Sequence, residues 1–343
     1  MLDASQADSA QLSAPPTVGR KSQLGQTKKP FVAFCWGTGG PAVNDYMRRM
    51  EWLESHFEVA YHDISDLTLG VSAGALAGLA GHMPDPKTGQ VPPACQSKIK
   101  VAKASQILMR PSLYFRELRL LSSRLSRDYF QAAWGDQPLS AAKSNIGVYT
   151  ASSRKKRGVR THILKSYAPF KEGGQDFRHV PAFRAAAATK AIPYACRPEK
   201  IDGFNMYDPA GIKALPFYKT ITQALKMAEP GQLVKVVVMT PGNDDNQVPW
   251  LTRRVFSRSP RTQIEIEIAK VCEKFSKDKY PHLEIIIVDP HAPSIIGRGF
   301  PRILDLSEEA ISFSHHLGIA AMEQCKVAFE NLKAQRGLSC AHV

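Results

Sequence analysis

The hydrophobic pattern of this chain alternates between short apolar runs and longer segments with apolar residues at helical spacing. Continuous apolar runs are typical of strands that are buried on both faces of a parallel sheet. Such strands are predicted at residues 31–36, 67–70, 234–239 and 285–288, and shorter ones at 57–61, 146–150 and 161–164. Helices are predicted at residues 41–54, 183–191, 219–228, 261–278 and 307–335. This alternation predicts an α/β fold, a three-layer sandwich with a central, mostly parallel sheet.

The folded part of the chain is expected to be one domain. Residues 1–29 are rich in Ser, Gln, Ala and Pro and lack periodicity, so they are predicted to be a disordered tail. Residues 30–335 carry the strand and helix pattern, and residues 336–343 form a short C-terminal tail. Of the 343 residues, 43% are hydrophobic, which is enough for a large core.

One serine lies where a predicted strand turns into a helical segment. The sequence is Gly70-Val71-Ser72-Ala73-Gly74, and an Ala/Leu-rich stretch follows it. A Gly-x-Ser-x-Gly turn of this kind lifts the serine hydroxyl out of the sheet, and its glycines keep Cβ atoms out of a crowded bend. Ser72 is therefore a candidate nucleophile, with Gly70 and Gly74 forming the elbow around it. The alternative is a plain small-residue turn that packs a helix against the sheet.

A glycine-rich loop follows the first strand and consists of Gly37, Thr38, Gly39 and Gly40. Backbone N–H groups in such a loop can bind an anion. The loop lacks the lysine and Ser/Thr of a P-loop, and Ala42 occupies the last glycine position of the dinucleotide-binding pattern. We therefore expect these four residues to form an oxyanion hole, although a plain tight turn would also fit the loop by itself.

An acidic candidate follows a hairpin pattern further along the chain. Asp202-Gly203 fits the tight turn of a β-hairpin, and Asp208 comes just after the short strand expected behind that turn. An aspartate in this place is either a turn former or a catalytic base.

Three blocks of this sequence together resemble the patatin-like phospholipase family. The first block is the glycine loop, 37–40, and the second is the Gly-x-Ser-x-Gly-Ala run, 70–75. The third is similar to the family's AIP, DG and DGG/DGA segments and comprises Ala-Ile-Pro (191–193), Ile-Asp-Gly (201–203) and Tyr-Asp-Pro-Ala-Gly (207–211). The resemblance covers about residues 30–330 and implies a patatin-like fold.

The resemblance implies a lipid acyl hydrolase of the phospholipase A type, which uses a Ser–Asp dyad and needs no cofactor or metal. By position, Ser72 is the nucleophile, Asp208 is the base that activates it, and the amides of the glycine loop form the oxyanion hole. Such an enzyme acts on carboxylic esters of phospholipids or related lipids.

Two prolines depart from the family pattern. Pro41 stands where Arg or Lys usually follows the glycines, and Pro209 stands where the aspartate motif has glycine. Proline removes a backbone N–H donor and fixes φ, so the placement of Asp208 is in question. A catalytically impaired member of the family is therefore an alternative.

Two other functions fit parts of the sequence. An α/β-hydrolase esterase orders its triad Ser, Asp, His, and Asp289 followed by His315 or His316 satisfies that order. That interpretation leaves the segment around Asp202 and Asp208 unexplained. A nucleic-acid-binding protein without catalysis would suit the net charge of +14, but no recognised module and no interleaving of aromatic and basic residues is visible. We therefore expect no nucleic-acid partner.

The positive charge also favours peripheral contact with anionic membranes. The segment 107–134 combines apolar residues at helical spacing with arginines, which fits either a helix on a membrane surface or a helix that covers the core. The densest basic cluster, 154–157, is expected to be a solvated loop.

The expected location is the cytoplasm, with peripheral membrane contact. No run approaches about 18 apolar residues, and the first residues have no apolar stretch of the secretory type. Six scattered cysteines without a C-x-x-C pair predict free thiols in a reducing compartment. Delivery as an effector by a route that needs no Sec-type signal peptide stays open.

Overall fold

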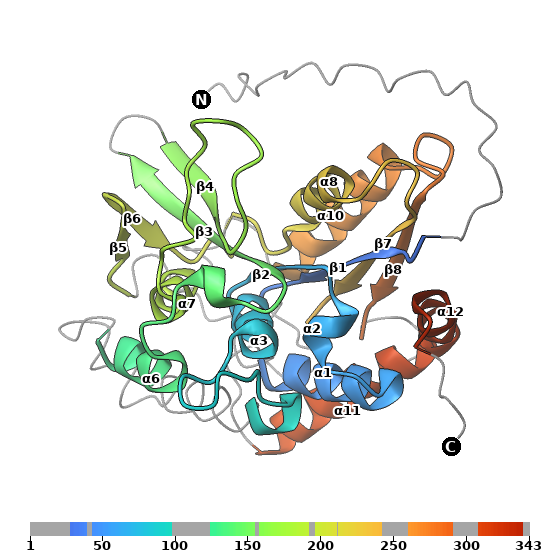
Figure 1. Ribbon diagram of the computed structural model, residues 1–343, viewed down its shortest axis with the longest axis horizontal. Coiled ribbons are helices and arrows are strands. Elements are labelled where there is room, and N and C mark those ends of the chain that lie inside the picture. The colour runs from blue at the N-terminus through green and yellow to red at the C-terminus, as the bar shows by residue number, and fades with distance from the viewer. Residues whose placement is uncertain are drawn as a thin grey trace.

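The computed structural model describes residues 28–39, 43–97, 124–154, 158–191, 196–210, 212–241, 260–290 and 308–338. Within them a mixed, mostly parallel sheet of eight strands runs through the molecule, and helices flank it (Figure 1). The strands are β1 Phe31–Trp36, β2 Leu67–Val71, β3 Asn145–Arg154, β4 Gly158–Lys165, β5 Glu199–Ile201, β6 Phe204–Tyr207, β7 Val234–Met239 and β8 Leu283–Val288. The predicted α/β class is confirmed, and the layers are compatible with a three-layer sandwich.

The helices lie on both faces of this sheet, with α8 and α10 on one face and α1, α3 and α7 on the other (Figure 1). Their bounds are α1 Val43–Phe57, α2 Tyr61–Ile64, α3 Ala73–His82, α6 Arg124–Trp134, α7 Ala182–Lys190, α8 Phe217–Met227, α10 Pro260–Lys274, α11 Glu308–Gln324 and α12 Lys326–Arg336, with a short 3₁₀ turn at Leu139–Ala141.

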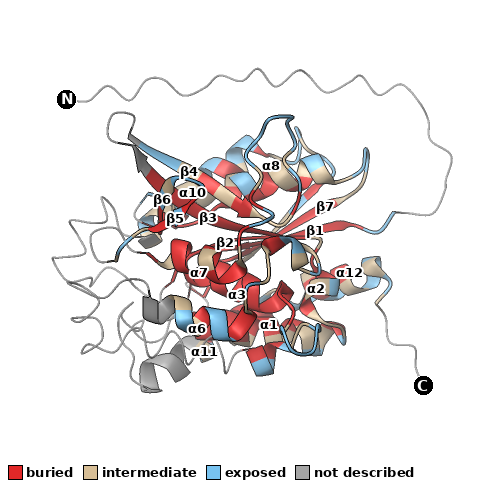
Figure 2. Ribbon diagram, turned by 60° about the vertical axis from the view of Figure 1, so that its left-hand side comes forward, coloured by how far each residue is buried: buried red, intermediate tan, exposed pale blue. Residues whose placement is uncertain are grey.

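The central strands are buried on both faces because alternate side chains enter two separate cores. In β1, Val32 and Phe34 belong to the core under α1 and α3, whereas Ala33 and Cys35 belong to the core under α8 and α10. Figure 2 shows the consequence: buried residues fill the sheet and the inner sides of both helix layers. This double burial explains why the sequence of β1 is a continuous apolar run.

The strand order β5-β6-β3-β2-β1-β7-β8 places parallel pairs in the middle and at one end of the sheet. β2, β1, β7 and β8 pair in parallel, and β2 also pairs in parallel with β3. The pairs that join β3 to β4, β3 to β6 and β5 to β6 are antiparallel. The carboxyl ends of the parallel strands therefore lie along one edge of the sheet, where loops can bring chemistry together.

Some predicted boundaries differ from the structure. Residues 57–61, predicted as a strand, form the end of α1 and the start of α2. Phe57 and Tyr61 are both buried at a spacing of one helical turn, and a carboxylate oxygen of Glu54 accepts the Tyr61 N–H at 3.1 Å. Phe57 therefore ends one helix and Tyr61 begins the next, and the two residues do not belong to a strand.

Two predicted helices also change. The segment 307–335 is divided into α11 and α12, with Cys325 between them. Of the segment 107–134, the structure describes α6, which is helical as predicted, and the rest lies outside the described residues. The predicted N-terminal tail lies outside them up to residue 27. Among the described helices, none is long and apolar enough to cross a membrane.

Candidate active site

Ser72 and Asp208 meet because two strands end against the same edge of β3. Val71, the last residue of β2, pairs with Tyr149, and Tyr207, the last residue of β6, pairs with Ala151. β4 occupies the other edge of β3 over this stretch, so β2 and β6 share one edge and approach each other end to end. Just one β3 residue, Thr150, separates the two pairings.

The backbone at Ser72 is a strained elbow. Ser72 has φ 51° and ψ −118°, and a non-glycine residue with positive φ costs free energy that the surrounding structure must supply. A Cβ atom on Gly70 would lie 2.5 Å from the Ala75 nitrogen, and one on Gly74 would lie 2.5 Å from the Gly37 oxygen. Both neighbours are backbone atoms, so the two glycines are required by close approach, as the Gly-x-Ser-x-Gly pattern predicts.

Thr189, which the sequence analysis did not single out, holds this elbow from α7. Its hydroxyl accepts the Ser72 N–H at 2.9 Å and donates to the Tyr149 carbonyl oxygen at 2.9 Å. Thr189 is fully buried. The sequence could not predict this role, because a single threonine in an Ala-rich helix belongs to no motif and the sequence does not tell that the helix ends beside Ser72.

Asp208 is buried, and its carboxylate lies close enough to the Ser72 hydroxyl for that hydroxyl to lower its pKa. The carboxylate also accepts a hydrogen bond from the Ala210 N–H at 2.9 Å. Its own N–H donates to the Ala191 carbonyl oxygen at 2.8 Å, just beyond the end of α7. Burial raises the pKa of Asp208 to about 7, although the Ala210 N–H and the Ser72 hydroxyl oppose that rise.

Pro209 does not displace Asp208 from the serine. The donor that Pro209 lacks is replaced by the next amide, because the Ala210 N–H turns back to the carboxylate. The Pro209 carbonyl oxygen accepts the N–H groups of Ile212 and Lys213 at 2.8 and 2.7 Å, which closes the turn. The departure from the family pattern is thus accommodated locally.

The predicted oxyanion hole needs a correction at two of its four residues. The Gly37 N–H donates to the Met239 carbonyl oxygen at 3.0 Å, and the Thr38 N–H donates to the Ala214 carbonyl oxygen at 2.8 Å. Amides that already donate within the protein are not available to a substrate oxygen. Of the other two predicted residues, Gly39 is buried, and Gly40 lies outside the described residues.

The first turn of α3 supplies donors that the sequence analysis did not name. Ala73 directly follows the nucleophile, and the structure gives its N–H and that of Gly74 no acceptor among the described residues. The first amides of a helix have no partner within the helix and carry the positive end of its dipole. The amide after the nucleophile is also a usual oxyanion donor in serine elbows, and this rule could have identified Ala73 from the sequence.

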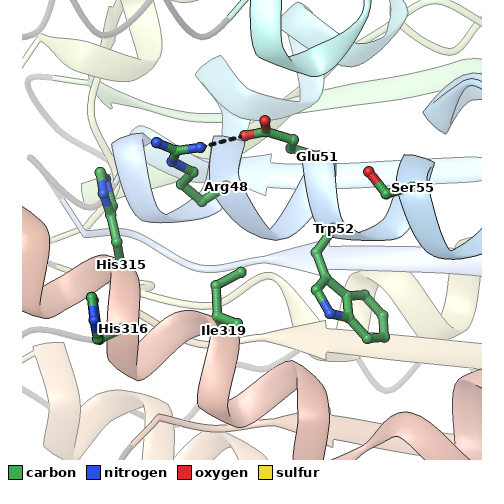
Figure 3. Close-up of a pocket in the computed structure, with 7 residues that line it drawn as sticks. All are labelled: Arg48, Glu51, Trp52, Ser55, His315, His316 and Ile319. Atoms are coloured by element: carbon green, nitrogen blue, oxygen red, sulfur yellow. Dashed lines mark hydrogen bonds and ion pairs between the residues drawn. The ribbon is translucent and has the colours of Figure 1, made fainter.

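The residues of the rival triad have other partners. Both oxygens of Asp289 accept from the Arg261 guanidinium at 2.9 Å, and Thr240 donates to the same carboxylate at 2.8 Å. His315 and His316 lie on α11 beside α1, where they line a pocket of about 510 Å³ with Arg48 and Glu51 (Figure 3). The contacts that the structure gives Ser72 and Asp208 include no histidine among the described residues.

The described part of the chain contains no group of three or more His, Cys, Asp or Glu side chains that could hold a metal ion. The candidate site therefore consists of a serine, a carboxylate with a raised pKa, and the start of a helix. Comparison with known proteins adds nothing to this geometry: no protein-family model matches the chain, and no curated protein matches it.

Proposed function

We propose that the protein is a serine acyl hydrolase that cleaves carboxylic esters of lipids, with Ser72 as nucleophile and Asp208 as general base. One observation carries the proposal: a serine in a strained elbow lies beside a buried carboxylate whose pKa is raised to about 7. A serine hydroxyl is a weak nucleophile and needs an adjacent base. A base works best when its pKa lies near the operating pH.

The reaction proceeds in two steps. Asp208 takes the proton of the Ser72 hydroxyl as the serine oxygen attacks the ester carbonyl, and the developing oxyanion is stabilised by the first amides of α3. The protonated Asp208 then gives its proton to the departing alcohol, which leaves an acyl-enzyme. Water hydrolyses this ester by the same route in reverse, with Asp208 again as the base, and the carboxylic acid is released.

The lipid part of the proposal rests on two supports. The three motif blocks resemble the patatin-like phospholipase family, whose members act on lipid acyl esters. The net charge of +14 favours contact with anionic lipid surfaces. A phospholipid or a related acyl ester is therefore the proposed substrate, and anionic membrane is the proposed partner.

The test compares ester hydrolysis by the wild type, Ser72→Ala and Asp208→Asn on a short p-nitrophenyl ester and on mixed phospholipid vesicles. Two matched controls use the same substitutions elsewhere: Ser152→Ala, at a buried serine bound to His162, and Asp202→Asn, in the hairpin turn. We expect both site variants to fall to background while they remain folded, and both controls to keep wild-type activity.

Three other outcomes would contradict parts of the proposal. If Ser72→Ala keeps its activity, the assignment of the nucleophile is wrong. If Asp208→Asn keeps its activity and alanine at His291, His315 or His316 removes it, the enzyme uses a triad. If the wild type hydrolyses neither substrate, with or without anionic lipid and added cell extract, the proposed function is wrong.

A further inference from the structure

A pocket of about 430 Å³ lies beside the candidate active site, between the loop 212–215 and α10. Its volume is in the range of sites that bind small ligands. Its lining combines apolar and charged side chains and includes Ile212, Lys213, Gln263, Ile266, Glu267 and Lys270. α10, which forms one side of the pocket, lies together with α8 on one face of the sheet (Figure 1).

One wall of the pocket is attached to the Asp208 turn and to the glycine loop. At one end, the N–H groups of Ile212 and Lys213 donate to the carbonyl oxygen of Pro209, the residue after Asp208. At the other end, the Ala214 carbonyl oxygen accepts the Thr38 N–H at 2.8 Å. A ligand in this pocket therefore lies against the loop that positions Asp208.

Tyr149 lies between the serine elbow and Glu267, a residue of the pocket lining. Its side chain packs with Val71, which precedes Ser72, and with Ala210 of the Asp208 turn. Its phenol is close enough to Glu267 for the carboxylate to raise its pKa, in addition to the larger effect of burial. One buried side chain thus lies near both a residue of the pocket lining and the elbow.

The charges in the pocket do not cancel. Glu267 is fully engaged, because one carboxylate oxygen pairs with the Lys213 ammonium and the other accepts the Tyr218 N–H at 3.3 Å. Lys270, one helical turn further along α10, makes no ion pair with any described residue. The formal charge of these three side chains is therefore +1.

The lining also has an apolar part. Ile212, four residues after Asp208, is 52% exposed. Ile266 on α10 lines the same pocket. The lining thus suits a ligand that is both apolar and singly negative.

We infer that this pocket is a subsite for an anionic group of the ester substrate, a phosphodiester, and that Lys270 is the residue that selects it. The inference rests on the proposed function, since the subsite acts by holding an ester whose acyl carbonyl reaches Ser72.

The first experiment uses two esters with the same short acyl chains: dihexanoyl phosphatidylmethanol, which carries a phosphodiester, and neutral dihexanoylglycerol. Both are assayed with the wild type, Lys270→Gln and Lys270→Glu. The matched control is Lys277→Gln, at an exposed lysine just beyond α10. We expect the wild type to prefer the anionic ester and Lys270→Gln to lower that preference about tenfold, which corresponds to about 1.4 kcal/mol.

The expected loss has a specific form. It should raise KM for the anionic ester, leave kcat/KM for the neutral ester within about twofold, and be larger for Lys270→Glu because a carboxylate repels the phosphodiester. Lys277→Gln should change neither substrate. If the wild type hydrolyses both esters and their ratio is the same in all variants, the subsite is wrong and the proposed function stands.

A second experiment separates the subsite from catalysis. Binding of a non-hydrolysable diether analogue of phosphatidylmethanol is measured by calorimetry on the wild type and on Lys270→Gln. If the wild type cleaves neither ester but binds the diether more tightly than Lys270→Gln does, the subsite stands and the proposed function is wrong. If the two proteins bind it equally, or not at all, the subsite is wrong.

Discussion

Burial sets the pKa of Asp208, the proposed base, and so controls the pH at which the proposed reaction can occur. The carboxylate is 3% exposed, and loss of hydration raises its pKa to about 7. In the proposed mechanism the ionised form accepts the serine proton, so kcat/KM should rise with pH through one ionisation near 7 and then level off. A pH profile of p-nitrophenyl ester hydrolysis between pH 5 and pH 9 measures this, after correction for the uncatalysed rate. A profile that is flat down to pH 5 would contradict the assignment of Asp208 as the base.

The same pKa has a consequence for stability, and its sign is opposite to that for activity. The pKa of Asp208 is higher in the folded state than the ordinary 3.8, so the folded state holds the proton more tightly. Stability from this group is fully present below about pH 4 and is lost as pH rises through about 7, by about 4 kcal/mol in total.

Asp208→Asn removes the cost of burying an ionised carboxylate. The variant should lose about 10²- to 10⁴-fold in kcat yet unfold at a higher temperature than the wild type at pH 8, and scanning calorimetry at pH 5 and pH 8 measures the difference.

Thr189 is a positioning residue, because its hydroxyl binds the backbone of Ser72 and not the substrate. Thr189→Val keeps the shape but leaves the Ser72 N–H and the Tyr149 carbonyl without this partner. A shift of the nucleophile by about 1 Å can cost about 10²-fold in rate, so kcat should fall by about 10- to 100-fold while KM stays near the wild-type value. Thr189→Ser restores the hydroxyl and should restore most of kcat. Equal losses in the two variants would indicate a packing role for Thr189.

At the scale of elements, the start of α3 is locked against the end of β1. A Cβ on Gly74 would lie 2.6 Å from both the Trp36 Cβ and the Trp36 carbonyl oxygen, so Gly74→Ala must push α3 away from β1. We expect this variant to lose most ester hydrolysis and at least about 2 kcal/mol in the free energy of unfolding. The matched control is Gly78→Ala on the same helix, where the nearest atoms to a Cβ are side-chain atoms of Thr68 and Ile146 and none is closer than 3.0 Å. Urea unfolding and ester assays on both variants test the prediction, and similar effects of the two substitutions would contradict it.

The elements differ in how far their sequence determines them. β1 and the elbow were predictable because their signals are local: an apolar run buried on both faces, and glycines where backbones touch. The meeting of β2 and β6 was not predictable, since it depends on β3 extending to Arg154 and on β4 occupying its other edge. The basic cluster 154–157 was predicted to be a solvated loop. Its first residue, Arg154, instead belongs to β3, where its backbone pairs with Gly158 of β4.

The oxyanion hole shows the same limit in the candidate site. A glycine loop after a strand predicts free amides, but the Gly37 and Thr38 amides are bound by Met239 and Ala214, which come about 180 to 200 positions later in the chain. Which amides remain available is therefore a property of the tertiary structure. Ser72 and Asp208 could be proposed from motifs, whereas their shared contact with the end of α7, through Thr189 and Ala191, could not.

At the scale of the whole molecule, the β3–β4 hairpin extends beyond the edge that carries Ser72. β2 ends level with Tyr149, and β3 continues from there to Arg154, a further five residues or about 16 Å. Figure 1 shows β3 and β4 reaching out from the body of the sheet. The residues that join the two strands, Lys155, Lys156 and Arg157, are all basic. The two residues that flank this basic stretch, Arg154 and Gly158, thus lie beyond the level at which β2 ends, on the side of the candidate active site.

This placement predicts that position, and not only net charge, governs binding to anionic membranes. A lysine near an anionic surface contributes about 1 kcal/mol, so the double variant Lys155→Gln/Lys156→Gln should bind vesicles with 30% phosphatidylserine roughly 30-fold more weakly at low salt.

The matched control is Lys277→Gln/Lys279→Gln, which removes the same charge from exposed lysines between α10 and β8. These residues precede the amino end of β8, opposite the edge that carries Ser72, so their loss should weaken binding much less. Sedimentation with vesicles at about 20 mM and 200 mM salt measures both effects, and screening at the higher salt should reduce the difference between the variants. Equal losses in the two double variants would mean that the overall charge alone attracts the protein, and the hairpin would then have no special part in docking.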